Sequence, residues 1–196
     1  MRYVFFEKEW RFGRFESYCY RREMKKAQIQ LYTGDGKGKT TAAVGLAARA
    51  LGHGLRVLFV QFMKNRKSGE IDFLELCGGE NFKLLRKWDG TFILSRPSEE
   101  QAKMCGDLWR MGLDTLERER YDMVVFDEIT VALSFGLLSE SSVIEFLRVK
   151  PLALEVVLTG QGATKEIVEA CDLVSEIRKI KHYYDKGIKA RKGVEY

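Results

Sequence analysis

The sequence of 196 residues has few of the residues and patterns that define several protein classes. It contains two histidines, His53 and His182, which nearly excludes a metal site built from several imidazoles. Its four cysteines form no CxxC pair, so we expect reduced thiols in the cytoplasm rather than a zinc ribbon or a redox dithiol. No apolar run reaches the roughly 18 residues of a membrane span, and the N-terminus has no secretory pattern. We therefore predict no membrane association.

The sequence also lacks a strong charge imbalance over most of its length. A net charge of +5 would favour nucleic-acid binding if it were spread over the protein. However, eight of the 33 Lys and Arg and four of the 28 Asp and Glu lie in residues 1–26, which leaves 25 basic and 24 acidic side chains in the other 170 residues. We therefore predict no nucleic-acid partner, while a basic cleft for a polyphosphate remains compatible with these numbers.

Residues 1–26 differ in character from the remainder of the chain. They are rich in Arg, Tyr and Phe and have neither a helical nor a strand period. We expect a basic and aromatic N-terminal extension over residues 1–26 and a single domain over residues 27–196. We further expect residues 1–23 to precede the native start, because Met24 comes just before the first regular segment. An arm that packs on a partner subunit is the alternative.

From Gln28 onward, apolar segments alternate with helical ones. The near-continuous apolar runs at 56–63 and 123–127 are typical of strands buried on both faces. Strands are predicted at 28–33, 56–63, 82–86, 123–127, 154–159 and 173–177, and helices at 39–51, 71–76, 98–119, 139–148 and 165–171. This alternation predicts an α/β fold of three layers, with a mostly parallel sheet covered by helices on both faces, of the P-loop NTPase (RecA-like) type. Ligands of such sheets bind beyond the carboxyl ends of the strands.

Residues 33–41 read Thr-Gly-Asp-Gly-Lys-Gly-Lys-Thr-Thr between a predicted strand and a predicted helix, which is the context of a phosphate loop. The glycines allow backbone N–H groups to surround phosphate oxygens, and the helix N-terminus adds its dipole. Lys39 supplies a charge for the terminal phosphates and Thr40 a hydroxyl for Mg²⁺. Thr33 stands where the usual pattern has Gly, and a Gly-rich turn is the alternative interpretation. The candidate phosphate-binding residues are Gly34, Asp35, Gly36, Lys37, Gly38, Lys39, Thr40 and Thr41.

A second candidate site lies where the buried strand at 123–127 ends in two adjacent acids, Asp127 and Glu128. Neighbouring side chains of a strand point to opposite faces, so we expect only one of the two to face the nucleotide directly. Mg²⁺ or Mn²⁺ on a triphosphate prefers hard oxygen ligands, and one carboxylate together with Thr40 would complete such a site. A solvated acidic turn is the alternative.

Several segments resemble the P-loop ATP:corrinoid adenosyltransferases, which act on cob(I)alamin or cob(I)yrinic acid a,c-diamide. The segments that carry the resemblance are 33–43, 48–54, 60–62, 125–130, 158–162, 180–190 and 193–196. The phosphate loop is common to many enzymes. Its combination with Lys-His-x-x-Asp-Lys-Gly at 181–187 is specific to this family.

The resemblance implies an enzyme that transfers the 5′-deoxyadenosyl group of ATP to Co(I) of a reduced corrinoid, in cobalamin biosynthesis or salvage. A Co–C bond forms and triphosphate is released, with ATP held along the loop in the opposite polarity to most P-loop enzymes. It also implies Mg²⁺ (or Mn²⁺), a homodimer, a cytoplasmic location and an electron-donor protein such as a flavodoxin.

Carried over residue by residue, the resemblance assigns metal binding to Thr40 and Glu128, with Asp127 in support, and catalysis to Lys39, Thr40 and Glu128. It further implies that Arg49 reaches phosphate from the first helix and that His182 lines the site near the C-terminal tail.

Two departures from the family pattern concern the substrates. Gln161 stands where the family often has a phosphate-contacting Arg, and glutamine does not supply that charge. The Phe-x-Trp pair that is thought to face the corrinoid is respaced here as Trp88 and Phe92. Trp88 and Phe92 are equally explained as packing residues.

Two other functions remain open at this stage. An ATPase or small-molecule kinase of the same fold would use Glu128 to activate its nucleophile, but no Arg-dense lid segment is present. A non-enzymatic, ATP-gated binding module is the second, and the near-neutral charge of residues 27–196 weighs against it.

Overall fold

The computed structural model describes residues 27–66, 68–91, 93 and 96–195 of the chain. The predicted N-terminal extension, with the expected start at Met24, lies outside these residues, as does Phe92. In the described part of the chain, the helices include none that is long and apolar enough to cross a membrane.

Six parallel strands form one sheet within the described residues. They are β1 (Ile29–Thr33), β2 (Val57–Gln61), β3 (Phe82–Arg86), β4 (Met123–Asp127), β5 (Glu155–Thr159) and β6 (Leu173–Glu176). Their order across the sheet is β3-β2-β4-β5-β1-β6, and every neighbouring pair is parallel. The phosphate-loop strand β1 and the acidic strand β4 are therefore separated by β5 alone.

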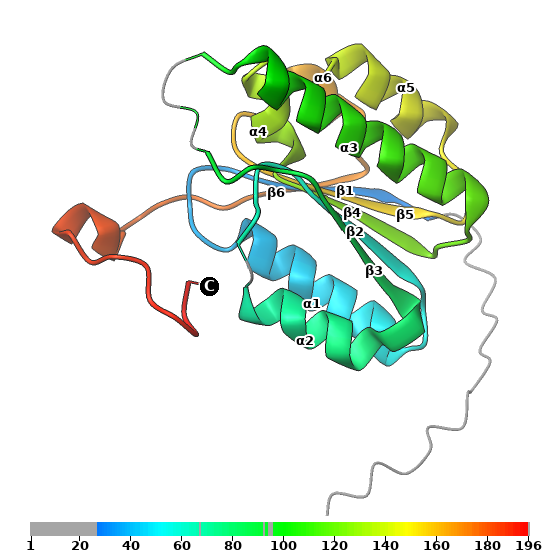
Figure 1. The fold of residues 1–196 in the computed structure, drawn as a ribbon, viewed down its shortest axis with the longest axis horizontal. Coiled ribbons are helices and arrows are strands. Elements are labelled where there is room, and N and C mark those ends of the chain that lie inside the picture. Colours follow the sequence, from blue (N-terminus) through cyan, green and yellow to red (C-terminus); the bar gives the residue numbers. More distant parts are fainter. Residues whose placement is uncertain (1–26, 67, 92, 94–95, 196) are drawn as a thin grey trace, which may run out of the picture.

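Helices cover both faces of the sheet, which confirms the predicted three-layer α/β fold. They are α1 (Lys39–Gly52), α2 (Gly69–Gly78), α3 (Glu99–Arg118), α4 (Ile129–Ser134), α5 (Glu140–Val149) and α6 (Lys165–Glu169), with the 3₁₀ turns η1 (Gly79–Asn81) and η2 (Tyr183–Lys186). Figure 1 shows α1 and α2 on one face and α3 to α6 on the other.

Alternate side chains of the central strands enter two separate hydrophobic layers. In β2, Leu58 and Val60 belong to the layer beneath α3 to α6, whereas Val57 and Phe59 belong to the layer beneath α1 and α2. All four are fully buried. Full burial of such a side chain contributes about 1.5–3 kcal/mol, so strands of this kind need apolar residues at every position.

The structure agrees closely with the predicted boundaries, with one added helix. The predicted capping box of α3 is present, because the Ser98 hydroxyl accepts from Gln101 N–H and the Gln101 side chain accepts from Ser98 N–H. Helix α4 was not predicted. It begins directly after the acidic strand end, and its N-cap is Glu128 in a left-handed conformation without a side-chain cap.

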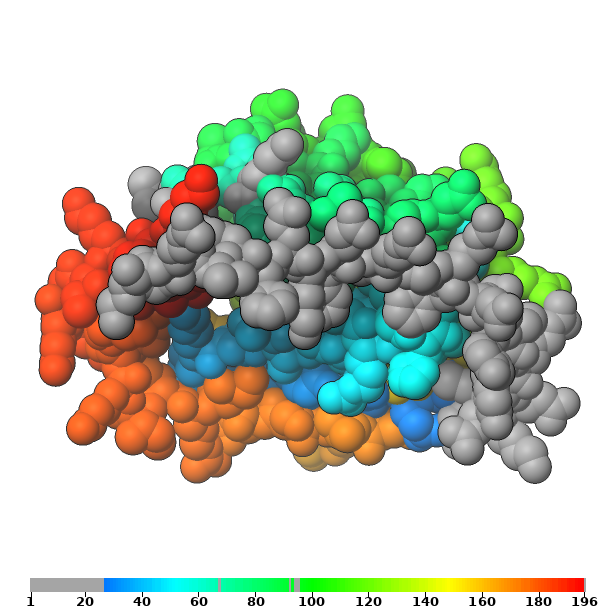
Figure 2. All heavy atoms as spheres, turned by 90° about the horizontal axis from the view of Figure 1, so that it is seen from below, coloured from blue at the N-terminus to red at the C-terminus, as the bar shows by residue number. Residues whose placement is uncertain are grey.

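The segment after β6 returns to the carboxyl edge of the sheet. Ile177 N–H donates to the Thr33 carbonyl, which extends the pairing of β6 with β1 as far as the phosphate loop. In Figure 2 the residues of this C-terminal tail (residues 177–195), orange to red, gather at one end of the molecule. The tail thus lies where the loops that follow the parallel strands also meet.

Candidate functional site

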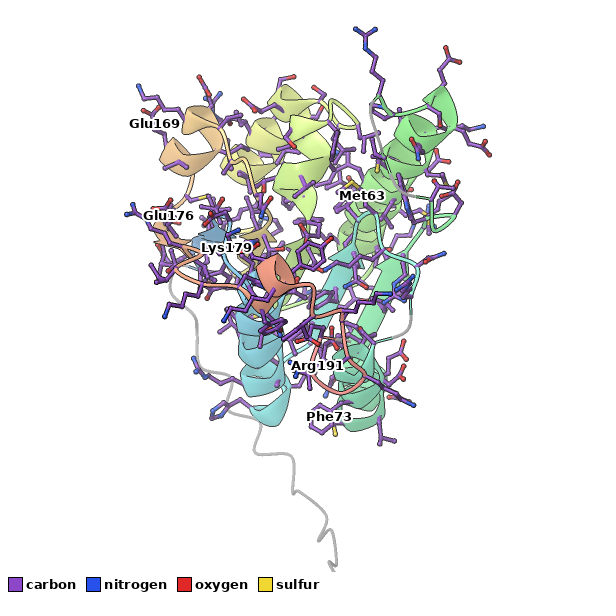
Figure 3. The ribbon with its side chains drawn as sticks, turned by 90° about the vertical axis from the view of Figure 1, so that its left-hand side faces the viewer. Met63, Phe73, Glu169, Glu176, Lys179 and Arg191 are labelled. Carbon is purple, nitrogen blue, oxygen red and sulfur yellow. The ribbon has the colours of Figure 1, made fainter. Side chains whose placement is uncertain are left out.

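A cavity of about 650 Å³ lies between the phosphate loop and the C-terminal tail. Its lining residues are Gly36, Lys37, Gly38, Lys39, Thr40, Thr41, Val44, Lys64, Gly69, Glu70, Glu128, Gly193, Val194 and Glu195. The cavity brings together most of the predicted phosphate-binding residues and one of the two acids of β4. Figure 3 looks onto this edge of the sheet, with Lys179 and Arg191 of the tail in front of it.

Two glycines of the phosphate loop allow the tail backbone to approach it closely. Gly34 has φ +101, and a Cβ at Gly34 or Gly36 would collide with the carbonyl of Ile177. Gly36 N–H donates to that carbonyl at 2.7 Å, and Asp35 accepts from Lys179 N–H at 2.9 Å. The loop is thus held by the tail, and the N–H of Gly36 is directed to protein rather than to the cavity.

Lys39 is directed inward, along its own loop. Its Nζ donates to the carbonyls of Gly34 at 2.8 Å and Gly36 at 2.7 Å, and the residue is 8% exposed. Burial lowers the pKa of Lys39 against an opposing contribution from Glu128. Gly38, with φ +124, is the N-cap of α1. The first N–H groups of the helix have no partner within the helix, and the residues that carry them line the cavity.

Asp127 is the centre of a buried hydrogen-bond network and is fully buried itself. One carboxylate oxygen accepts from Thr40 at 2.8 Å and from Thr159 at 2.7 Å. The other accepts from Gln61 and from Lys64, each at 2.9 Å. Burial would raise the pKa of Asp127, but the nearby Lys64 ammonium and the hydrogen bonds outweigh it, so the pKa lies below its ordinary value.

Glu128 departs from the side-chain alternation expected for a strand. Its φ of 62 and ψ of 21 are left-handed, which ends β4, and its side chain lines the cavity beside Lys64. Its N–H donates to Thr159 Oγ1 at 2.9 Å. As a result both acids lie beside the same cation, since Lys64 Nζ is 2.9 Å from Asp127 and 3.5 Å from Glu128. Of the two acids only Glu128 lines the cavity, because Asp127 is fully buried, and the expectation that one of the two faces the nucleotide directly stays a prediction.

Lys64 was not predicted from the sequence. It follows β2 by three residues, and its Nζ contacts Thr40 Oγ1 at 3.1 Å in addition to the two carboxylates. The two carboxylates outweigh burial and raise the pKa of Lys64 above its ordinary value. Its location after a buried strand was the available signal, because the carboxyl ends of parallel strands meet at one edge.

Gln61 and Arg86 extend the Asp127 network across the sheet and were also missed. They are the last residues of β2 and β3, and the strand register pairs Gln61 with both Arg86 and Asp127. The Arg86 guanidinium donates to Gln61 Oε1, and Gln61 Nε2 donates to Asp127. These hydrogen bonds orient the Asp127 carboxylate through the oxygen atom that Thr40 does not contact.

The end of the tail pairs with Lys37 of the phosphate loop. Lys37 Nζ lies 2.9 Å from Tyr183 Oη and 3.1 Å from Glu195. Glu195 also accepts from Tyr183 and from Arg191. Hydrogen bonds from Arg191 and Tyr183 lower the pKa of Glu195, and those to Tyr183 and Glu195 raise the pKa of Lys37. Lys37 and the Glu195 carboxylate thus form an ion pair, and both residues line the cavity.

Six predicted site residues are not among those that line this cavity. Gly34, Asp35 and Asp127 are described above, and the other three are Arg49, Gln161 and His182. Arg49 is exposed in the last turn of α1. The Gln161 side chain reaches the Asp35 carbonyl of the phosphate loop at 3.5 Å. His182 caps η2, where its Nδ1 accepts from Tyr184 N–H at 3.1 Å. Its neighbour Tyr183 is the aromatic residue that contacts the loop.

A second cavity of about 290 Å³ adjoins the first. Lys64, Glu70 and Glu195 line both. Trp88 lines the second cavity and also packs against the hydrophobic layer beneath α3, while its indole N–H donates to the Thr91 carbonyl. Trp88 is thus a packing residue that also borders a cavity, and its contact with the corrinoid stays a prediction.

The oxygen atoms of Thr40, Asp127 and Glu128 form a hard donor set that suits Mg²⁺ or Mn²⁺. Within the described residues, no group of three or more His, Cys, Asp or Glu could hold a metal ion. Two carboxylates and a hydroxyl fit an ion that keeps waters and binds substrate phosphates.

A phosphate loop between a parallel strand and a helix, facing an acidic strand end across one cavity, defines a P-loop nucleotide-binding domain. The sequence model of the family described as ATP:corrinoid adenosyltransferase BtuR/CobO/CobP matches residues 25–196. The chain belongs to this family.

Relatives from several bacteria are similar over nearly the same length. The corrinoid adenosyltransferase of Escherichia coli K12 is 38% identical over 172 residues, which cover 86% of this chain and 85% of the relative. Corrinoid adenosyltransferase CobA of Salmonella typhimurium is 40% identical over 169 residues, with coverages of 86% and 85%. That of Pseudomonas aeruginosa is 33% identical over 174 residues, with coverages of 88% and 85%.

Proposed function

We propose that this chain transfers the 5′-deoxyadenosyl group of ATP to the Co(I) ion of a reduced corrinoid. The observation that carries the proposal is that the family match runs through the whole described fold and that three of its separate segments line one cavity. The phosphate loop, the acidic end of β4 and the C-terminal tail are far apart in sequence and all line this cavity.

The proposed reaction is a displacement at the 5′ carbon of ATP. The electron pair of Co(I) forms the Co–C bond, and the bond from that carbon to the triphosphate oxygen breaks. Triphosphate leaves with the bonding electrons. The Co(I) nucleophile carries no proton, so none has to be removed from it. The protein therefore needs a cradle for an anionic leaving group and a fixed geometry for the carbon and the cobalt, more than it needs a general base.

The residues of the first cavity suit the leaving group. We propose that the loop from Gly34 to Thr41 binds the triphosphate, with the Lys39 and Lys37 ammonium groups countering its charge. Lys39 turns from the loop carbonyls to the phosphates at little cost, because it exchanges neutral acceptors for anionic ones. Gln161, which contacts the loop backbone, would hold the loop in shape rather than supply charge.

We propose that Thr40 and Glu128 hold Mg²⁺ or Mn²⁺, with Asp127 as the supporting carboxylate. When bound, the metal would neutralise charge on the triphosphate. The protein contributes by fixing its donors, since Asp127 orients the Thr40 hydroxyl and Thr159 binds both Asp127 and the Glu128 backbone.

The corrinoid would approach from the second cavity. Trp88 and Met63 present apolar surface there, and Lys64, Glu70 and Glu195 are common to both cavities. An apolar surface next to the phosphate cradle is what a flat macrocycle with a central metal would need to reach the 5′ carbon. Arg49 and His182 line neither cavity.

The decisive experiment incubates the full chain with Mg-ATP and chemically reduced corrinoid and follows the visible spectrum. A light-sensitive Co–C product and release of triphosphate support the proposal. ADP as the released product would identify phosphoryl transfer instead, the activity of an ATPase or kinase that uses Glu128. Absence of product above the protein-free control rejects the proposal.

Lys39→Ala is the matched inactive variant for that assay. We expect it to lose adenosyl transfer while retaining the fold, because its Nζ contacts only loop carbonyls among the described residues. Retained activity would contradict the assignment of the phosphate loop.

Family membership further leads us to propose a homodimer and a cytoplasmic electron donor such as a flavodoxin that supplies Co(I). Light scattering after size-exclusion chromatography tests the first proposal. Replacement of the chemical reductant by a reduced flavodoxin in the adenosylation assay tests the second.

A further inference from the structure

Lys64 lies where a divalent cation would have to bind. Its ammonium is within 3.5 Å of Glu128, 3.1 Å of Thr40 Oγ1 and 2.9 Å of Asp127. These are the three side chains with the hard oxygen atoms of the proposed metal site. The Lys64 ammonium therefore already contacts the two proposed metal ligands, Thr40 and Glu128, and the carboxylate proposed to support them.

The geometry does not allow both cations to keep these contacts. A Mg²⁺ ion binds oxygen at about 2.1 Å. Since Lys64 Nζ is 3.1 Å from Thr40 Oγ1, a metal on that oxygen would lie within about 5 Å of the ammonium. The region is partly shielded from water, because Asp127 is fully buried and the Lys64 side chain is 33% exposed. Repulsion between the two cations is therefore poorly screened.

The Lys64 ammonium would have alternative acceptors within the first cavity when nucleotide is bound. It lines the first cavity together with Lys37 and Lys39, where the triphosphate would bring several anionic oxygens. Without nucleotide, the two carboxylates are the strongest acceptors in its reach. With nucleotide, phosphate oxygens would compete for the ammonium and leave the carboxylates to the metal.

We propose that Lys64 is a positioning residue that acts as the internal counter-ion of the metal site and is displaced when nucleotide and metal enter together. This inference rests on the proposed metal role of Thr40 and Glu128. It makes the nucleotide-free protein a poor metal binder and couples metal binding positively to nucleotide binding. Because such coupling is reciprocal, metal also tightens the binding of the triphosphate.

The test measures the affinity of the nucleotide-free full chain for Mn²⁺, from the electron paramagnetic resonance signal of the free ion. Lys64→Met removes the charge, and we expect it to bind Mn²⁺ about tenfold more tightly or better than the unaltered chain, because one nearby cation is gone. Lys64→Gln is a second neutral variant, and it retains a hydrogen-bond donor for Asp127. It replaces Lys64→Met in the test if the methionine variant is poorly folded.

Two further variants separate charge from general perturbation. Lys64→Arg keeps the positive charge and is expected to bind Mn²⁺ as weakly as the unaltered chain. Lys83→Met removes a lysine of β3 that forms an ion pair with Glu119. Lys83 has an exposure similar to that of Lys64 and lines neither cavity, so this variant is also expected to leave the affinity unchanged.

A thermal readout provides an independent check. We expect Mn²⁺ without nucleotide to raise the melting temperature of Lys64→Met more than that of the unaltered chain, since metal restores the missing counter-charge.

The inference is overturned if both neutral variants bind Mn²⁺ no more tightly than the unaltered chain, or if Lys64→Arg binds it as tightly as Lys64→Met. These outcomes do not contradict the proposed adenosyl transfer, because that activity is judged by the Co–C product. Absence of adenosyl transfer likewise does not change the measured Mn²⁺ affinities.

Discussion

Some side chains at the carboxyl edge of the sheet were predicted from sequence motifs, and others were found there only in the folded structure. Lys39 and Thr40 belong to a contiguous pattern, and the two acids end a recognisable buried strand. Lys64 lies in no motif, and Gln61 and Glu195 lie in segments that resemble the family without indicating a role at the site. Their roles depend on strand order and on the path of the tail, which a linear reading does not supply.

Asp127 gives a prediction for the dependence of stability on pH. Its pKa is lowered in the folded protein, so it contributes stability above the unfolded pKa of about 4, and this contribution is lost as pH falls toward the folded pKa. We expect Asp127→Asn to lower the free energy of unfolding at pH 7 by about 1.5–3 kcal/mol, as for loss of hydrogen bonds to a charged group.

Urea denaturation of both proteins between pH 3 and pH 7 checks this. The gap between them should narrow below about pH 4 as the native carboxylate loses its advantage. A gap that stays constant over the whole range would contradict the assigned direction of the Asp127 pKa.

At the scale of elements, the phosphate loop and the tail behave as one unit. The loop was predicted from its glycines, which were expected to accommodate phosphate. The structure shows a second reason why glycine is needed at positions 34 and 36, because the Ile177 carbonyl fills the space of a side chain at both positions. The contact joins residues 34 and 177, and only the pairing of β6 with β1 brings them together.

Gly34 and Gly45 provide a matched pair of substitutions. Gly34→Ala places a methyl group against the Ile177 carbonyl at φ +101 and should displace the tail, weakening ATP binding measured by calorimetry. Gly45→Ala lies inside α1 with open space around it and should stabilise the protein by up to about 1 kcal/mol without changing ATP binding. Equal ATP affinities for the two variants would argue against the contact between loop and tail.

Tyr183 and Tyr184 test how the tail is held. Tyr183 contacts both Lys37 and Glu195, whereas Tyr184 is 71% exposed. We expect Tyr183→Phe to speed tryptic cleavage after the basic residues that follow it, because the tail opens more often, while Tyr184→Phe leaves the rate unchanged. Mass spectrometry of timed digests measures the rates, and similar rates for the two variants would show that the Tyr183 hydroxyl does not anchor the tail.

At the scale of the whole molecule, alternation of strands and helices was sufficient to predict the three-layer fold, because strands buried on both faces leave near-continuous apolar runs. The order of the strands was not predictable in the same way. Neighbouring strands β1 and β6 are separated by most of the chain, and their pairing depends on side-chain packing between remote segments.

Ligand binding to the folded state should appear in the melting temperature. Mg-ATP at about 100 times its dissociation constant adds about 2.7 kcal/mol to stability, which corresponds to a rise of about 5–10 °C for a chain of this size. Lys39→Ala should show little of this rise. Differential scanning calorimetry measures both, and equal shifts in the two proteins would place the nucleotide elsewhere.

The left-handed backbone conformation of Glu128 makes stability and activity favour different residues at this position. A residue with a side chain adopts φ 62 at an energetic cost that glycine avoids. Glycine at position 128 would relax the end of β4, yet it would remove a carboxylate from the cavity. A search for more heat-resistant variants would therefore favour glycine here and remove a proposed metal ligand, so selection for thermostability of this protein has to be paired with selection for turnover.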